Sequence, residues 1–188
     1  MRKVVVSEFL TLDGVMEEPR WTLEYFGEEE GQFKLHEMMT ADDLLLGRVT
    51  YEGFAAAWPS RTDEDGYAER INTMPKHLVT TTLTEGPWQN THIVAADNLA
   101  EYVTRLKQQP GQDILVFGSG QLVQTLMQHN LVDEFRLMVF PLVVGKGQRL
   151  FQEGSTANLK LVSSKAHPSG VTVLTYAPAP KKEEANQD

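Results

Sequence analysis

The chain has 188 residues, 41% of them hydrophobic and 23% charged, which fits one globular domain with a sizeable core. Its formal net charge is −9 and it has no basic stripe, so a nucleic-acid partner is not expected. The absence of cysteine excludes disulfides, thiolate catalysis and cysteine-based metal sites. No apolar run is long enough for a signal peptide or a membrane span, and we expect a cytoplasmic protein.

The N-terminal part of the chain predicts a strand, a loop and a helix. Residues 3–10 contain three consecutive valines in a nearly continuous apolar run, which indicates a buried strand. An Asp-Gly turn over residues 11–14 follows the strand. Residues 15–29 show no clear periodicity and read as a long ordered loop, and residues 32–40 read as a helix.

Strands and helices alternate through the middle of the chain. The predicted strands and helices are, in order, a strand at 43–47, a helix at 50–57, a surface helix at 67–71, strands at 77–82 and 91–95, and a helix at 98–107. Asn98 is a candidate N-cap for the last helix, and Glu101 at the third helical position completes a capping-box pattern.

The last third changes from alternating elements to mostly strand. A strand at 114–117 leads into a helix at 119–128, and strands follow at 133–140, 159–166 and 171–176. This order predicts an α/β fold with a mostly parallel sheet, helices on both faces and antiparallel strands at the C-terminal end. The charged tail at 178–188 is expected to be disordered.

Two of the apolar strands run directly into glycine turns that open helices. One turn lies within residues 44–52 and carries Gly47, and the other lies within residues 114–122 and carries Gly118 and Gly120. Glycine lets a backbone approach a ligand closely, and free N–H groups at a helix start favour an anion. Because ligands bind at the carboxyl ends of parallel strands, two such turns favour one extended ligand with several phosphates, such as a dinucleotide.

Each of these motifs also has a purely structural interpretation. Gly118-Ser119-Gly120 gives an incomplete dinucleotide fingerprint, and either a tight turn or a phosphate site explains it. The planar donor fork of Arg48 and the helix-start position of Thr50 suit phosphate, although a surface ion pair and a simple cap would also explain them. The hydroxyls of Thr80, Thr81 and Thr82 gain meaning only if the sheet brings that strand end beside Gly47. The scattered histidines do not suggest a metal site.

Four motifs in order resemble a known family. The segment Gly47-Arg48-Val49-Thr50-Tyr51-Glu52 and the turn at 117–120 resemble the dihydrofolate reductase superfamily. The turn at 11–14 and the segment at 140–147 more closely resemble the C-terminal reductase domain of the bifunctional riboflavin-biosynthesis deaminase–reductase and its stand-alone relatives. The resemblance covers about residues 1–177 and implies a three-layer α/β/α dihydrofolate reductase-like fold for that domain.

The resemblance implies an NADPH-dependent reductase that transfers a hydride to a pyrimidine or pterin intermediate, similar to 5-amino-6-(5-phosphoribosylamino)uracil. In the family, residues at these positions contact the cofactor phosphates, the adenosine 2′-phosphate, the pyrophosphate and the nicotinamide. The matching positions here are Gly47, Arg48 and Thr50 for the phosphates, Thr80 and Thr81 for the 2′-phosphate, Gly118, Ser119, Gly120, Gln121 and Leu122 for the pyrophosphate, and Leu12 and Gly14 beside the nicotinamide.

The substrate side is less defined. Dihydrofolate reductases bind pterin through a carboxylate on the helix before the Gly-Arg turn, and the matching position here is Gly31, with Glu30 beside it. Glu30 and Asp13 are therefore the catalytic candidates, although Asp13 before glycine is equally a turn former. A riboflavin-pathway-type heterocycle is preferred, and a true dihydrofolate reductase and a non-catalytic nucleotide-binding module are the alternatives. The family resemblance also suggests a homodimer.

Overall fold

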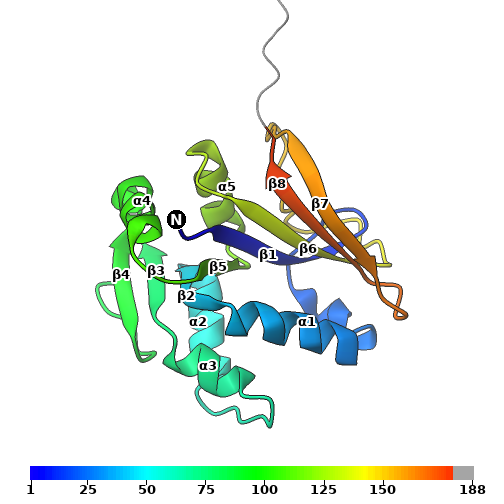
Figure 1. Ribbon diagram of the computed structural model, residues 1–188, viewed down its shortest axis with the longest axis horizontal. Helices are drawn as coiled ribbons and strands as arrows, with labels where there is room; N and C mark the ends of the chain where they lie inside the picture. The colour runs from blue at the N-terminus through cyan, green and yellow to red at the C-terminus, as the bar shows by residue number, and fades with distance from the viewer. Residues whose placement is uncertain (180–188) are drawn as a thin grey trace, which may run out of the picture.

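An eight-stranded sheet of order β4-β3-β2-β5-β1-β6-β8-β7 organises the computed structural model, which describes residues 1–179 (Figure 1). The strands are β1 (Val4–Thr11), β2 (Ala41–Gly47), β3 (Lys76–Thr80), β4 (Thr91–Ala95), β5 (Asp113–Phe117), β6 (Glu134–Phe140), β7 (Leu159–Ala166) and β8 (Thr172–Pro178). Strands β1 to β6 pair in parallel, whereas β8 pairs antiparallel with both β6 and β7. The predicted mixed sheet is confirmed.

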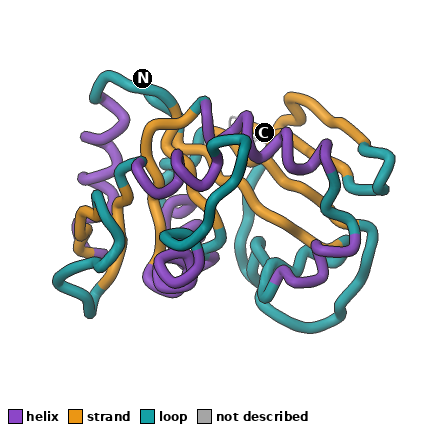
Figure 2. Tube along the Cα trace, turned by 90° about the horizontal axis from the view of Figure 1, so that it is seen from below, coloured by secondary structure: helices purple, strands orange, loops and turns teal. Residues whose placement is uncertain are grey.

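Helices cover both faces of the sheet, as the view in Figure 2 shows. The helical elements are η1 (Pro19–Glu24), α1 (Glu28–Met39), α2 (Arg48–Ala57), α3 (Tyr67–Thr73), η2 (Ala96–Asn98), α4 (Leu99–Gln108) and α5 (Gly120–Gln128). One core cluster joins Val4 and Val6 of β1 to α4 and α5, and a second joins Val5 to α1, α2 and α3. These valines are fully buried. The three-layer α/β/α fold follows from this two-sided burial.

The long loop predicted at 15–29 is ordered by aromatic packing. Part of it forms η1, and the rings of Trp21 and Tyr25 meet the ring of Phe140 edge-on, with centroids 5.3 Å and 6.1 Å away. Phe9 of β1 meets Phe140 in the same manner at 5.6 Å. The packing of these half-buried rings against the fully buried Phe140 explains how a segment without periodicity keeps one conformation.

The start of α1 and the predicted capping box before α4 differ from the structure. Helix α1 begins at Glu28, four residues before the expected start, because its first turn carries three acids that favour the positive end of the helix dipole. The capping box predicted at Asn98 was wrong: η2 runs directly into α4, and the Asn98 side chain makes no cap hydrogen bond. Glu101 instead pairs with Arg105 at 2.9 Å.

The described part of the chain extends through Ala179. Pro178 is the last residue of β8, and the Ala179 N–H donates to the Asn158 carbonyl at 2.8 Å, so these two residues do not belong to a disordered tail. The rest of the predicted tail, residues 180–188, lies outside the described residues. Leu161 and Val162 are exposed on the edge strand β7. The homodimer that the sequence analysis expects stays a prediction. Within residues 1–179, no helix combines the length and apolarity needed to cross a membrane.

Candidate active site

A cavity of about 1560 Å³ opens at the carboxyl ends of four parallel strands. β1 contributes residues 7–9, and β2, β3 and β5 contribute Gly47, Thr80 and Phe117 respectively. These ends meet because the four strands run in the same direction, with β2 and β1 on either side of β5. This is the edge of an open α/β sheet where ligands bind.

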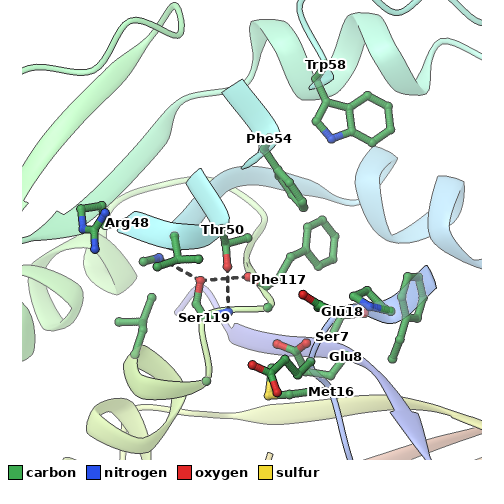
Figure 3. A pocket seen from close by; sticks show the side chains of 18 of the residues that line it. Ser7, Glu8, Met16, Glu18, Arg48, Thr50, Phe54, Trp58, Phe117 and Ser119 are labelled. Atoms are coloured by element: carbon green, nitrogen blue, oxygen red, sulfur yellow. Dashed lines mark hydrogen bonds between the residues drawn. The ribbon is translucent and has the colours of Figure 1, made fainter. Parts of the chain in front are cut away.

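The two glycine turns are hydrogen-bonded to each other across this edge (Figure 3). Thr50 Oγ1 accepts from the Ser119 backbone N–H at 2.9 Å, and Ser119 Oγ accepts from the Gly47 N–H at 2.9 Å. Gly118 has a φ of +56°, and a Cβ there would lie 2.7 Å from Thr50 Oγ1. Only glycine therefore permits this contact, and the two turns form one rigid unit.

The donors in this half of the cavity suit an anion. Helix α5 starts at Gly120, and the backbone N–H groups of its first turn have no acceptor within the helix. Gly120, Gln121 and Leu122 all line the cavity. Arg48 also lines it, with its side chain 45% exposed and paired with Glu52 at 2.9 Å. A helix start and a guanidinium on one wall provide the donor set that phosphate groups require.

The threonine-rich end of β3 lies beside the first glycine turn. Gly47 pairs with Val79 in the register of β2 and β3, which fulfils the condition set by the sequence analysis. Thr80 Oγ1 accepts from the backbone N–H groups of Thr82 and Leu83 at 3.1 and 3.2 Å, so this hydroxyl holds the loop in place. Thr81 is exposed and lines the cavity.

Aromatic rings line the other half of the cavity. In Figure 3 the rings of Phe54 and Phe117 lie between Trp58 and the end of β1. Further ring systems in the lining are Phe9, Phe26 and Tyr67. Flat ring faces of this kind favour a planar ligand through offset or edge-on stacking.

A buried lysine stands at the base of the aromatic half. Lys34 of α1 donates to Ser7 Oγ at 2.8 Å and to Glu37 Oε2 at 2.7 Å. Its Nζ also lies 4.1 Å from the centroid of the Phe117 ring. The ammonium group is thus held by a carboxylate, a hydroxyl and an aromatic face, which compensate for its burial.

Glu8 is a cavity-lining carboxyl that the sequence analysis did not single out. Its side chain is only 5% exposed, and its Oε1 atom has no hydrogen-bond partner within residues 1–179. Burial raises the pKa of Glu8 well above its usual range, against the opposing effects of Lys34 and of the Gly118 N–H. A charged residue within a strand that is mostly apolar was the signal available in the sequence.

Asp13, Leu12 and Gly14 do not line the cavity. Asp13 accepts from Thr11 Oγ1 at 2.6 Å and from the Val144 and Gly145 N–H groups at 3.2 and 2.8 Å. The Thr11 hydroxyl is the main reason that the pKa of Asp13 falls to about 2. The turn therefore anchors a neighbouring loop, and it is the following segment at 16–19 that reaches the cavity.

Glu30 also lies away from the cavity. Its carboxylate accepts from Ser169 Oγ at 2.5 Å, His167 Nδ1 at 2.9 Å and the Gly27 N–H at 2.9 Å. Burial alone would raise the pKa of Glu30, but these hydrogen bonds lower it to about 2. The residue links the start of α1 to the turn between β7 and β8, and the α1 residues that line the cavity are Gly31, Lys34 and Leu35.

The family model of the RibD C-terminal domain matches residues 2–173, nearly the whole chain. The chain belongs to the RibD C-terminal domain family. Two Bacillus subtilis (strain 168) proteins are similar to it, and both are named as uncharacterized. YyaP is 30% identical over 179 residues, covering 93% of this chain and 94% of YyaP. YwjB is 29% identical over 156 residues, covering 81% of this chain and 84% of YwjB.

Solved structures share the fold of this RibD C-terminal domain. One is a protein from Shewanella sp. PV-4 that is named, provisionally, as a riboflavin biosynthesis protein. It has a TM-score of 0.69 and 21% sequence identity, and the match covers 94% of this chain and 99% of the Shewanella chain. Another is a pyrimidine reductase-like protein from Corynebacterium diphtheriae. It also has a TM-score of 0.69, at 10% identity, and covers 95% of this chain and 92% of its own. At these identities the likeness shows the fold alone.

For this RibD C-terminal domain the structure gathers ten predicted cofactor residues around one cavity. They are Gly47, Arg48, Thr50, Thr80, Thr81, Gly118, Ser119, Gly120, Gln121 and Leu122. Their role in binding stays a prediction. Residues 1–179 contain no group of three or more acidic or histidine side chains placed to hold a metal ion.

Proposed function

We propose that this RibD C-terminal domain is an NADPH-dependent reductase acting on a planar heterocycle of the pyrimidine or pterin type. The observation that carries the proposal is the joined pair of glycine turns, which opens on the same cavity as an aromatic half. Donors for phosphate and ring faces for a heterocycle thus share one continuous space. The expected cytoplasmic location belongs to the same proposal.

The residues of the cavity fit the cofactor that the family resemblance implies. The free N–H groups at the start of α5 would hold the pyrophosphate, and Arg48 would bind a further phosphate after releasing Glu52. Thr81 would contact the 2′-phosphate from the loop after β3. When bound, the reduced nicotinamide supplies a hydride, while the chain supplies binding, orientation and exclusion of water.

The polarity of the substrate half favours a riboflavin-pathway-type heterocycle over folate. Pterin binding in dihydrofolate reductases uses a carboxylate of the early helix, but α1 presents Lys34 to this cavity and turns Glu30 away from it. A cation beside Phe117 suits a ring with carbonyl oxygens, such as a uracil, better than the amino-pyrimidine edge of a pterin. Dihydrofolate therefore serves as the comparison substrate.

Cofactor binding is tested by thermal unfolding with NADPH or NADH. A ligand at 100 times its Kd stabilises the folded protein by about 2.7 kcal/mol, so a saturating cofactor raises the melting temperature. Arg48→Ala should weaken NADPH binding by about 1.5–3 kcal/mol, or about 10- to 150-fold, through loss of charged hydrogen bonds. Arg105→Ala is the matched control, because Arg105 forms the same kind of exposed helical pair at 2.9 Å on α4. An unchanged melting temperature with both nucleotides refutes the proposal.

Turnover is tested by following NADPH absorbance with 5-amino-6-(5-phosphoribosylamino)uracil and with 7,8-dihydrofolate. We expect oxidation with the aminouracil at a higher kcat/KM than with dihydrofolate. The reverse preference would favour a folate reductase. Stabilisation by NADPH without oxidation by either probe would favour the non-catalytic nucleotide-binding module.

A further inference from the structure

Glu8 lines the cavity of the candidate site. It is the fifth of eight residues of β1, the strand between β5 and β6, and its backbone pairs with Leu137 of β6. Its neighbour Ser7 pairs with Phe117, the residue that leads into the second glycine turn. Figure 3 shows Glu8 close to Met16 at the side of the cavity opposite Trp58. The carboxyl group therefore lies where the phosphate-binding half meets the aromatic half.

The Glu8 carboxyl has no charged partner at this site, in contrast to the buried carboxylate of Glu37. Glu37 accepts from Ser7 and Lys34, and its Oε1, which has no hydrogen bond, lies 3.6 Å from Arg136. Within residues 1–179, Glu8 has no salt-bridge partner within 4.0 Å and no hydrogen bond to Oε1. An unpaired buried oxygen is costly, and because Glu8 lines the cavity, its carboxyl group is available to a bound ligand.

The surroundings of Glu8 favour its neutral, protonated form. Burial is the main cause of its raised pKa, and the negative charge of Glu37 adds to it. Lys34 and the Gly118 N–H oppose this increase, and Arg136 of β6 is already engaged with Glu37 and Glu134. A protonated carboxyl has one O–H donor, and within the described residues Oε1 has no hydrogen-bond partner.

We propose that Glu8, which lines the cavity, is the proton donor of this site, delivering its carboxyl proton to the nitrogen of a bound C=N substrate. The proposal rests on the proposed reductase function. Reduction of a C=N bond adds a hydride to carbon and a proton to nitrogen. The reduced nicotinamide dinucleotide supplies the hydride and is oxidised, and Glu8 supplies the proton and becomes a carboxylate. Water then returns a proton to Glu8, so that the overall reaction consumes one proton from solution.

The test compares wild type with Glu8→Gln. Glutamine keeps the shape and can accept from the Gly118 N–H, but it has no proton to give at neutral pH. Glu24→Gln is the control, because Glu24 is an exposed acid of η1 that does not line the cavity. The measurements are NADPH binding by fluorescence, single-turnover oxidation of NADPH with 5-amino-6-(5-phosphoribosylamino)uracil or 7,8-dihydrofolate, and infrared detection of a protonated carboxyl.

We expect an infrared band of a protonated carboxyl at pH 7 that Glu8→Gln removes and Glu24→Gln keeps. The Glu8 variant should bind NADPH within about twofold of wild type, but its single-turnover rate should fall by about 100-fold or more. The wild-type rate should fall as pH rises through the pKa of Glu8, because the acid form is the donor. The decrease of the rate with rising pH should be absent in Glu8→Gln.

Three results overturn the proposal: an ionised Glu8 at pH 7, equal single-turnover rates in wild type and Glu8→Gln, or a wild-type rate that does not fall with rising pH. The last two leave the reductase function intact, because NADPH is still oxidised. If wild type oxidises NADPH with neither probe, the reductase function itself fails and the donor role fails with it. Should Glu8→Gln not fold, the infrared band and pH profile of wild type decide.

Discussion

Replacing Glu30 with glutamine tests whether this carboxylate has a structural role or a catalytic one. Glu30 is 2% exposed, and its oxygens accept from Ser169, His167 and Gly27. Through these bonds it fastens the first turn of α1 to the turn between β7 and β8. Glu30→Gln removes the charge and turns one acceptor oxygen into a donor that opposes these donors, so we expect lower stability without a change in NADPH affinity.

The pH dependence of Glu30 sets the size of the effect. Its pKa falls from an ordinary 4.5 to about 2 on folding, a shift that corresponds to about 3 kcal/mol. Because α1 starts near the surface, solvent screening reduces this to about 2 kcal/mol. Since the folded pKa is the lower one, this stabilisation is fully present above pH 4.5 and is lost as the pH falls toward 2.

The assay is urea unfolding of wild type and Glu30→Gln between pH 7 and pH 3, with Glu28→Gln as the control. Glu28 lies in the same first turn and is exposed, so its loss tests the helix dipole, the net charge and one exposed hydrogen bond from Gln32 at 2.9 Å. We expect Glu30→Gln to lose about 2 kcal/mol at pH 7 and the difference from wild type to narrow toward pH 3. Equal losses in the two variants, or a difference independent of pH, would refute this reasoning.

Two further substitutions test the turns and the aromatic packing. Gly118→Ala should cost at least about 1–2 kcal/mol from its left-handed backbone, plus the overlap with Thr50 Oγ1. Gly154 has a φ of +84° and open space where a Cβ would lie, so Gly154→Ala measures the backbone cost alone. Equal urea midpoints for the two variants would show that the contact between Gly118 and Thr50 imposes no constraint. Phe140→Ala should cost about 3–5 kcal/mol because the side chain is fully buried against three aromatic rings, and it should increase amide exchange around Trp21. A loss below about 1 kcal/mol would show that the ring cluster does not order this loop.

The cofactor half of the site was predictable because its signals are local. A strand, a glycine and a helix start are adjacent in the chain, so the turns at Gly47 and Gly118 follow from short-range patterns. The placement of Thr80 beside Gly47 depends on the order of strands in the sheet, which the sequence analysis left open and the pairing of β2 with β3 supplies. The hydrogen bond between Thr50 and Ser119 was not predictable, since it joins two separate segments.

The substrate half escaped prediction because its residues acquire meaning from distant partners. Glu30 looked available in the sequence, but His167 and Ser169 from the other end of the chain occupy it. In the sequence, Glu8 looked like an ordinary acid in a strand. Its pKa is raised mainly because it is buried, and it belongs to β1, which lies between β5 and β6. The capping box predicted at Asn98 failed although the local sequence favours it, because η2 runs directly into α4 at this residue.

The central position of β1 has a consequence for how the protein is made. β1 is synthesised before both of its neighbours in the sheet: Val4 pairs with Ile114, and Val5 pairs with Glu134. Such distant pairing slows folding, because a long loop must close before any contact compensates for it. Since β1 carries Ser7, Glu8 and Phe9 into the cavity, chains released before β6 is complete would lack the floor of the site. The cavity therefore gets its complete lining only after β5 and β6 have been synthesised and have paired with β1.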